Sequence, residues 1–131
     1  MNSICKELEH FVKIGNKYTF EIYEDMSPPN ESGVICKSGF ISHIVKMNNG
    51  VFILFNDGEE ELLIETTYNN KPNVWELLYD NKRPSGFISQ GQILSMSLNG
   101  TNDETSADNK LFNWISQDEN VFSELLNNTH A

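Results

Sequence analysis

The stretch that decides the fold is SGFISHIVKMNNGVFILFNDGEEELLIETT, residues 38–67. It contains two dipeptides, Asn49-Gly50 and Asp57-Gly58, that favour a tight type I′ turn because these residue types tolerate positive φ. The apolar segments on either side of the two dipeptides therefore predict three consecutive antiparallel strands.

The middle strand is expected to be buried on both of its faces. Its sequence VFILF, residues 51–55, is apolar at every position, whereas a strand with one solvated face alternates between apolar and polar residues. The two turns predict a register in which Met47 lies opposite Phe52 and Phe55 lies opposite Glu60. Burial on both faces favours a curled sheet or a small barrel.

Further elements are expected on both sides of these strands. Ser3 can cap a helix with a single apolar stripe (Ile4, Leu8, Phe11 and Val12) that closes at Gly15. Residues 17–25 alternate between apolar and polar side chains, as a half-buried strand does. Residues 85–100 are interpreted as a strand in which Gly91 introduces a bulge or a bend.

The remaining segments complete the predicted architecture. Residues 73–80 fit a short helix or a strand, and residues 111–126 carry apolar side chains on one helical face, with a capping pattern at Ser116 that can start a second helix. The predicted fold is a single domain, residues 1–131, of the α+β, β-rich class. It consists of an antiparallel meander that forms a curled sheet or small barrel, flanked by an N-terminal helix and one or two C-terminal helices.

The pentapeptide SGFIS occurs twice, at residues 38–42 and at residues 85–89. The segments that follow the two copies share neither hydrophobic phase nor turn position, as a duplicated unit would require. We therefore interpret the two copies as one way of leading a turn into a strand, used twice.

The acidic excess is concentrated in two stretches. The chain has 19 acidic and 9 basic residues and a formal net charge of −10. Residues 47–70 contain five acidic residues and no basic one, and residues 84–131 contain six acidic residues and one lysine. Such a field repels phosphates and attracts basic surfaces. Arg83 is the sole arginine, so direct binding to nucleic acid is not expected.

The sequence predicts neither export nor insertion into a membrane. Its first residues lack the basic start and apolar core of a secretory signal, and no apolar run approaches the roughly 18 residues that a membrane span needs. Two cysteines, Cys5 and Cys36, are too few for a disulfide framework. We expect a cytoplasmic protein with free thiols.

Candidate catalytic chemistry is sparse. The available bases are His10, His43 and His130, and none of them belongs to a recognisable nucleophile motif. Glu59 and Glu61 are expected to share a strand face, where two carboxylates could perform acid–base work. No motif predicts a metal or a cofactor, so an enzyme that uses the Glu59/Glu61 cluster is only an alternative.

Aromatic residues follow the acidic stretch directly. Tyr68, Trp75 and Tyr79 bracket the Lys71-Pro72 dipeptide, and Tyr and Trp are enriched at interface hot spots because they bury much area at a small cost in entropy. Core packing is the alternative role, and it is favoured for Trp114 more than for Trp75. The candidate partner-binding residues are Asp57, Glu59, Glu60, Glu61, Glu65, Tyr68, Trp75 and Tyr79.

Residues 39–63, GFISHIVKMNNGVFILFNDGEEELL, resemble the strands of small SH3-like and Tudor-like barrels, where a hairpin ends in an acidic turn. A series of strands closed by a C-terminal helix that carries Trp114 is also similar to pleckstrin-homology-like domains. The basic first hairpin that binds phosphoinositides in those domains is missing here. Neither resemblance transfers a function to this chain.

The leading hypothesis is a non-catalytic acidic protein that binds and blocks a basic, nucleic-acid-handling protein, such as a toxin immunity protein or a phage anti-defence protein. Targets of this kind expose lysine and arginine for their substrate, and opposite charge speeds association. The alternative from another class is a small-ligand-binding or sequestering protein that holds its ligand inside the curled sheet.

Overall fold

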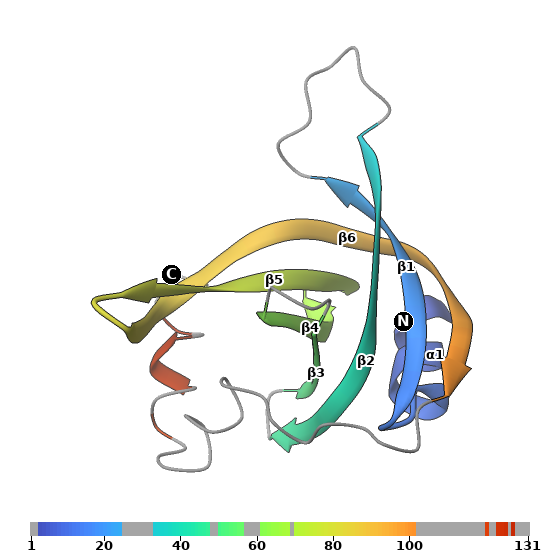
Figure 1. Ribbon diagram of the computed structural model, residues 1–131, viewed down its shortest axis with the longest axis horizontal. Coiled ribbons are helices and arrows are strands. Elements are labelled where there is room, and N and C mark those ends of the chain that lie inside the picture. Colours follow the sequence, from blue (N-terminus) through green and yellow to red (C-terminus); the bar gives the residue numbers. More distant parts are fainter. Residues whose placement is uncertain are drawn as a thin grey trace.

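A closed barrel of six antiparallel strands forms the body of the protein (Figure 1). This computed structural model describes residues 3–24, 33–47, 50–56, 61–68, 70–101, 120, 123–125 and 127. Each strand pairs with the next, and the last pairs with the first. The elements are α1 (Ser3–Phe11), β1 (Asn16–Glu24), β2 (Val34–Met47), β3 (Gly50–Asn56), β4 (Glu61–Tyr68), β5 (Lys71–Asp80) and β6 (Arg83–Thr101).

The predicted antiparallel meander and N-terminal helix are confirmed. Residues 73–80, which fitted a helix or a strand, belong to β5. Of the predicted C-terminal helices, the structure describes only residues 120, 123–125 and 127, and these are helical.

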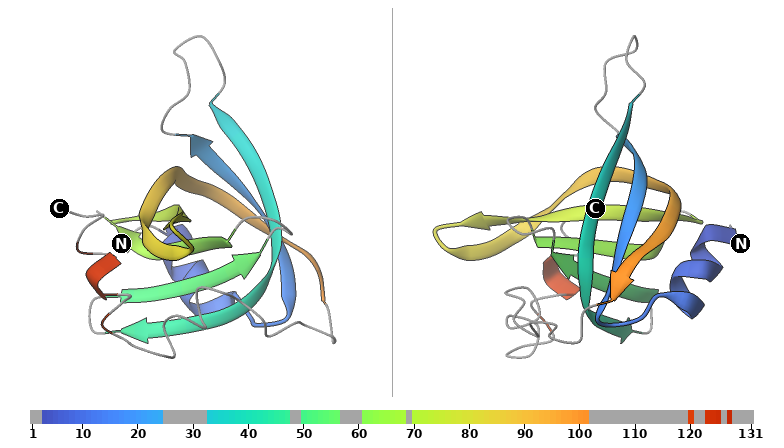
Figure 2. Two further views of the ribbon diagram at one scale, coloured as in Figure 1. Left: turned by 60° about the vertical axis from the view of Figure 1, so that its left-hand side comes forward. Right: turned by 45° about the vertical axis from the view of Figure 1, so that its right-hand side comes forward.

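Helix α1 packs on the barrel on the side away from the β5–β6 hairpin (Figures 1 and 2). Leu8 and Val12 are buried against the barrel, whereas Phe11 is 66% exposed, so the predicted apolar stripe is wrong at this position. The carboxylate of Glu9 accepts hydrogen bonds from the hydroxyl groups of Thr66 at 2.8 Å and Thr67 at 3.4 Å, which tie the helix to β4. In the part of the chain that the structure describes, no helix is long and apolar enough to cross a membrane.

Strand β3 divides the buried side chains into two cores, because successive side chains point to opposite faces of a strand. Ile53 and Phe55 point into the barrel, and Phe52 and Leu54 point outward, yet all four are fully buried. The residues inside form the barrel core, which comprises Leu8, Val12, Tyr18, Phe20, Ile22, Ile41, Ile53, Phe55, Leu62, Ile64, Val74 and Ile93. The residues outside form the outer core, which comprises Phe52, Leu54, Leu63, Trp75, Leu77, Phe87 and Leu125.

The predicted register of the hairpins is wrong by two residues. Met47 lies opposite Gly50 and not Phe52, and Phe55 lies opposite Leu62 and not Glu60. A shift of two residues leaves every side chain on the same face of the sheet, so the hydrophobic pattern cannot distinguish the two registers.

Strand β6 closes the barrel by pairing with two neighbours in succession. Its first half pairs with β5 and its second half with β1, and Gly91 lies opposite both Val74 and Glu24. The register with β5 shifts next to Gly91, which confirms the predicted bulge. A Cβ atom on Gly91 would collide with the carbonyl oxygen of Tyr23, and its φ of 133° favours glycine. Figure 1 shows the resulting long arc of β6.

The two SGFIS copies occupy different environments. Residues 38–42 lie within β2 and not at its start, so the prediction of a shared turn is wrong for this copy. Ile41 is fully buried in the barrel core, whereas Ile88, its counterpart in the second copy, is 47% exposed. Gly39 is required for packing, because a Cβ atom there would collide with the carbonyl oxygen of Asn56.

Candidate functional site

The candidate residues that the structure describes gather on the outward face of β4 and β5. They are Glu61, Glu65, Tyr68, Trp75 and Tyr79. The other three candidates, Asp57, Glu59 and Glu60, lie outside the described residues. By sequence they belong to the segment that connects Asn56 to Glu61, and these two residues are opposite each other in the register.

Two side-chain hydrogen bonds of similar length join β4 to β5 on this face. The indole Nε1 of Trp75 donates to Oε1 of Glu65 at 3.0 Å, and the hydroxyl of Tyr79 donates to Oε2 of Glu61 at 2.9 Å. Trp75 lies opposite Leu63, so its bond to Glu65 runs diagonally between the strands. Tyr79 lies four residues after Trp75 in β5, and Glu61 lies four residues before Glu65 in the antiparallel β4, so the second bond has the same sequence offset as the first.

Trp75 belongs to the outer core, and Glu65 is buried beside it. Trp75 is 5% exposed and Glu65 is 4% exposed, and the rings of Tyr68 and Trp75 meet in a T-shaped arrangement with 5.2 Å between ring centroids. A carboxylate withdrawn from water needs hydrogen-bond donors to offset its desolvation. In these positions the two side chains stabilise the fold and are not available to a partner.

The Tyr79–Glu61 pair lies at the surface. Tyr79 is 40% exposed, and burial of its ring, followed by the hydrogen bond and the charge of Glu61, holds the pKa of its hydroxyl well above the usual value of 10.0. Glu61 is the residue at which the acidic connection from Asn56 joins β4. The pair therefore places an accessible aromatic ring next to the most acidic part of the sequence.

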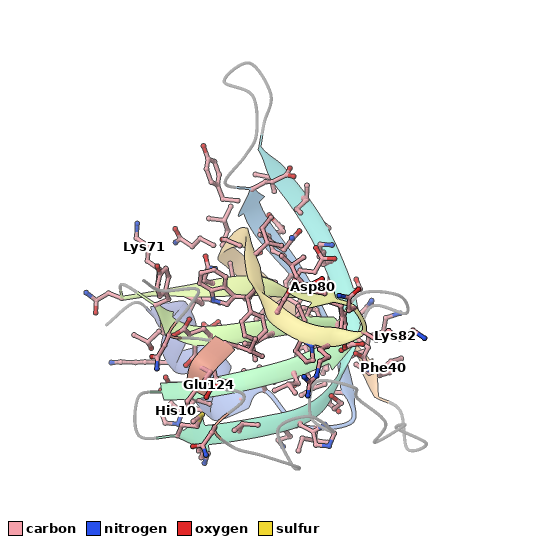
Figure 3. All side chains as sticks on the ribbon, turned by 90° about the vertical axis from the view of Figure 1, so that its left-hand side faces the viewer. His10, Phe40, Lys71, Asp80, Lys82 and Glu124 are labelled. Carbon is pink, nitrogen blue, oxygen red and sulfur yellow. The ribbon has the colours of Figure 1, made fainter. Side chains whose placement is uncertain are left out.

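Tyr79 also belongs to a projecting hairpin, the β5–β6 arm, which comprises residues 77–88. The arm extends away from the barrel (Figure 1), and Figure 3 shows Asp80 and Lys82 at its turn. Asn81 and Lys82 have φ values of 49° and 66°, as a tight two-residue turn requires. This turn is not predicted by the sequence, because it contains no glycine. Leu78 and Ile88 add exposed apolar side chains to the arm.

The described residues are nearly balanced in charge. They include nine of the 19 acidic residues and eight of the nine basic residues. The acidic excess therefore belongs to the segments outside the described residues, including the connection between Asn56 and Glu61. The barrel itself is an almost neutral scaffold for these acidic segments.

The described residues contain few side chains that are arranged for catalysis or for metal binding. No group of three His, Cys, Asp or Glu side chains that could hold a metal is present in the described ranges. His10 is exposed, and His43 is a partly buried residue of β2 whose pKa is lowered by burial. Glu59 lies outside the described residues, so the structure does not place the Glu59/Glu61 cluster.

No protein-family model, no curated protein and no solved structure matches this chain. Functional inference therefore depends on the geometry and charge described above.

Proposed function

We propose that this protein is a non-catalytic acidic binding protein that blocks a basic, nucleic-acid-handling protein, in the manner of a toxin immunity protein or a phage anti-defence protein. The observation that carries the proposal is the exposed Tyr79–Glu61 pair, which lies where the acidic connection of residues 57–60 joins β4. An accessible tyrosine that is hydrogen-bonded to the carboxylate at the end of an acidic segment suits a surface that is rich in lysine and arginine.

The mechanism is competition for the partner's substrate site. Proteins that handle nucleic acid display basic side chains to the phosphates, and an acidic surface seated on those side chains excludes the substrate. Long-range attraction between opposite charges accelerates the encounter, and the Tyr79 ring and the β5–β6 arm then provide contact area. We place the encounter in the cytoplasm, where the free thiols of Cys5 and Cys36 stay reduced.

The described residues offer less support for the two alternatives. Twelve buried side chains make up the barrel core, so a small ligand would have to displace packed apolar groups. For an enzyme that uses Glu59 and Glu61, one oxygen of Glu61 already accepts a hydrogen bond from Tyr79. Neither alternative is favoured by a specific observation.

The test is capture of a partner at low and high salt, followed by an assay of the purified partner. Tagged protein is exposed to lysate at about 0.05 M and about 0.5 M NaCl, where screening lengths differ several-fold. We expect a basic protein that is retained at low salt and whose binding to, or cleavage of, nucleic acid is inhibited by this chain. A captured protein whose activity is unaffected, or the absence of a salt-sensitive partner, would contradict the proposal.

Charge-reversal variants locate the acidic surface. The triple variant Glu59→Lys, Glu60→Lys and Glu61→Lys should slow association with the partner at least about tenfold. A matched control, Glu7→Lys, Glu21→Lys and Glu124→Lys, changes the net charge equally at three exposed positions elsewhere. Equal slowing in both variants would show that net charge alone, and not the connection between β3 and β4, governs binding.

A further inference from the structure

Strand β2 continues beyond the end of β3 and leaves part of one edge open. The β2–β3 ladder ends at the pair Phe40–Asn56, whereas the β1–β2 ladder continues as far as Tyr23–Val34. Within the described ranges, residues 34–39 therefore pair with β1 on one side and with no strand on the other. The barrel is closed, but among the residues that the structure describes this segment is an edge strand.

The hydrogen-bonding alternation shows which backbone groups face the open side. The amide of Glu24 donates to the carbonyl of Gly33 at 2.6 Å, so this pair is hydrogen-bonded across the ladder. In an antiparallel ladder, bonded and non-bonded pairs alternate, and the backbone groups of a non-bonded pair point away from the partner strand. Val34, Cys36 and Ser38 occupy the non-bonded positions, so their N–H and C=O groups point away from β1.

This edge lacks most features that protect an edge strand against pairing. Proline, bulges and charged side chains usually prevent addition of a further strand, yet residues 34–39 contain no proline and pair with β1 without a register shift. Lys37 is the one charged residue, and it shares the face of Phe20, opposite to the face of Cys36. The side chains of Val34 and Cys36 are exposed.

We propose that Val34, Cys36 and Ser38 of β2 bind an extended basic segment of the partner as an added antiparallel strand. The inference rests on the proposed function for the nature of the partner. Addition of a strand to a sheet edge is a common mode of peptide recognition, in which main-chain hydrogen bonds supply the affinity. Each of the three residues offers one donor and one acceptor to such a strand.

The charge of the chain decides between a partner and a second copy. Two copies that paired through β2 would each carry a net charge of −10, and their mutual repulsion opposes association. An added antiparallel strand would run in the direction of β3, because β3 is itself antiparallel to β2. Its first residues would lie next to Asn56, where the acidic connection begins, so we expect lysine or arginine there.

The first test uses a defined peptide and the unmodified protein. The probe is a short synthetic peptide that begins with two lysines and continues with alternating valine and threonine. Hydrogen exchange followed by NMR should show that the probe slows exchange at the amides of Val34, Cys36 and Ser38 at least about tenfold. The amides of Ile35 and Lys37, which face β1, should change much less. The same peptide with alternate amides N-methylated, or with glutamates in place of lysines, should have little effect.

Absence of protection with the lysine probe would overturn the proposal, as would equal protection by the N-methylated peptide. Sedimentation of the protein without the peptide provides a further outcome. A dimer whose formation protects the amides of Val34, Cys36 and Ser38 would show that a second copy, and not a basic partner, occupies the edge.

The second test uses a matched pair of variants and the partner from the capture experiment. Cys36→Pro removes the central outward N–H without removing a bond to β1, a placement that edge strands tolerate. Cys36→Val changes the side chain but keeps the N–H. We expect Cys36→Pro to weaken binding of both the probe and the partner about tenfold or more, and Cys36→Val to leave it unchanged.

The outcomes separate this proposal from the proposed function. If the purified partner is inhibited by the Cys36→Pro variant as strongly as by the original protein, strand addition is wrong and the proposed function stands. If the probe protects the edge amides while no basic partner is captured, strand addition stands and the proposed function is wrong. If Cys36→Pro fails to fold, the exchange measurement on the unmodified protein still decides.

Discussion

Glu65 is a buried acidic residue next to the outer core, and the indole N–H of Trp75 donates a hydrogen bond to its side chain. Removal of a donor from such a group leaves a buried acceptor with fewer hydrogen bonds, which costs more than the bond contributes when it is formed. The fold therefore depends on the identity of the aromatic residue at position 75 as well as on its size.

We predict that Trp75→Phe lowers the free energy of unfolding by about 1–3 kcal/mol through loss of this donor, in addition to the effect of the smaller ring. Glu65→Gln should cost less, because the amide oxygen can still accept the indole N–H. Urea denaturation of the two single variants and the double variant measures the coupling between the side chains. Additive effects would contradict a direct role for the hydrogen bond.

His43 should make stability depend on pH. Burial lowers its pKa in the folded protein below the ordinary value of 6.5, so the unfolded chain binds the proton more tightly. The contribution of His43 to stability is thus present above about pH 6.5 and is lost as the pH falls. We predict that His43→Gln reduces the loss of unfolding free energy between about pH 7.5 and about pH 5.5.

The control for this prediction is His10→Gln, because the His10 side chain is exposed on α1. Urea denaturation of the original protein and both variants across this pH range is the measurement. Equal pH dependence in the original protein and the His43→Gln variant would contradict a role for burial of His43.

At the scale of single elements, β6 combines closure of the barrel with formation of the β5–β6 arm. The change of neighbour occurs at Gly91, where the strand passes close to the backbone of Tyr23. Gly100 lies on the same strand with a φ of 156°, but a Cβ atom there would meet nothing within 4 Å. The two glycines therefore differ chiefly in the space around them.

We predict that Gly91→Ala lowers the free energy of unfolding by roughly 2–3 kcal/mol more than Gly100→Ala does, because only the first added methyl group collides with backbone. Thermal and urea denaturation of the two variants test the difference. Similar losses in both would indicate that backbone conformation, and not the contact with Tyr23, makes glycine necessary at position 91.

The strands themselves could be predicted from the sequence, but their register could not. The Asn-Gly and Asp-Gly dipeptides and the apolar run in β3 indicate consecutive strands and burial on both faces. The register depends on where each turn closes, and shifts by two residues preserve the facing pattern. Residues 73–80 were ambiguous for a related reason, because Val74 and Trp75 are buried on opposite faces and remove the alternation of β5.

At the scale of the whole molecule, the outer core is completed by a residue from outside the barrel. Leu125, from the C-terminal helical residues, packs against the group that includes Leu77 and Phe87. Figures 1 and 2 show this segment below the β5–β6 arm, and Figure 3 labels its neighbour Glu124. Leu125, which is distant in sequence from the strands, thus packs on the outward face of the sheet.

We predict that Leu125→Ala lowers the free energy of unfolding by about 2–4 kcal/mol, as expected for a Leu side chain that is 5% exposed. Glu124→Ala is the matched control, since Glu124 is the adjacent exposed residue, and its effect should lie within about 0.5 kcal/mol of zero. Chemical denaturation measures both. Equal effects would show that the segment contributes little to the packing of the outer core.

The candidate site was predictable in part. Charge and aromatic composition identified Glu61 and Tyr79, which the structure brings together at the surface, but composition alone could not show that Glu65 and Trp75 are buried. The open edge of β2 could not be predicted, because it depends on the relative lengths and registers of three strands. Such a feature belongs to the assembled strands and not to any one segment of the sequence.

The pairing of β1 with β6 also determines when the barrel can close during synthesis of the chain. Asn16 lies opposite Thr101 in the closed sheet. The first strand to leave the ribosome therefore cannot complete its pairing until the last strand has been synthesised. Contacts of such long sequence separation form slowly. The nascent chain therefore carries an unfinished sheet until its sixth strand has emerged, and during that interval chaperones are best placed to protect it.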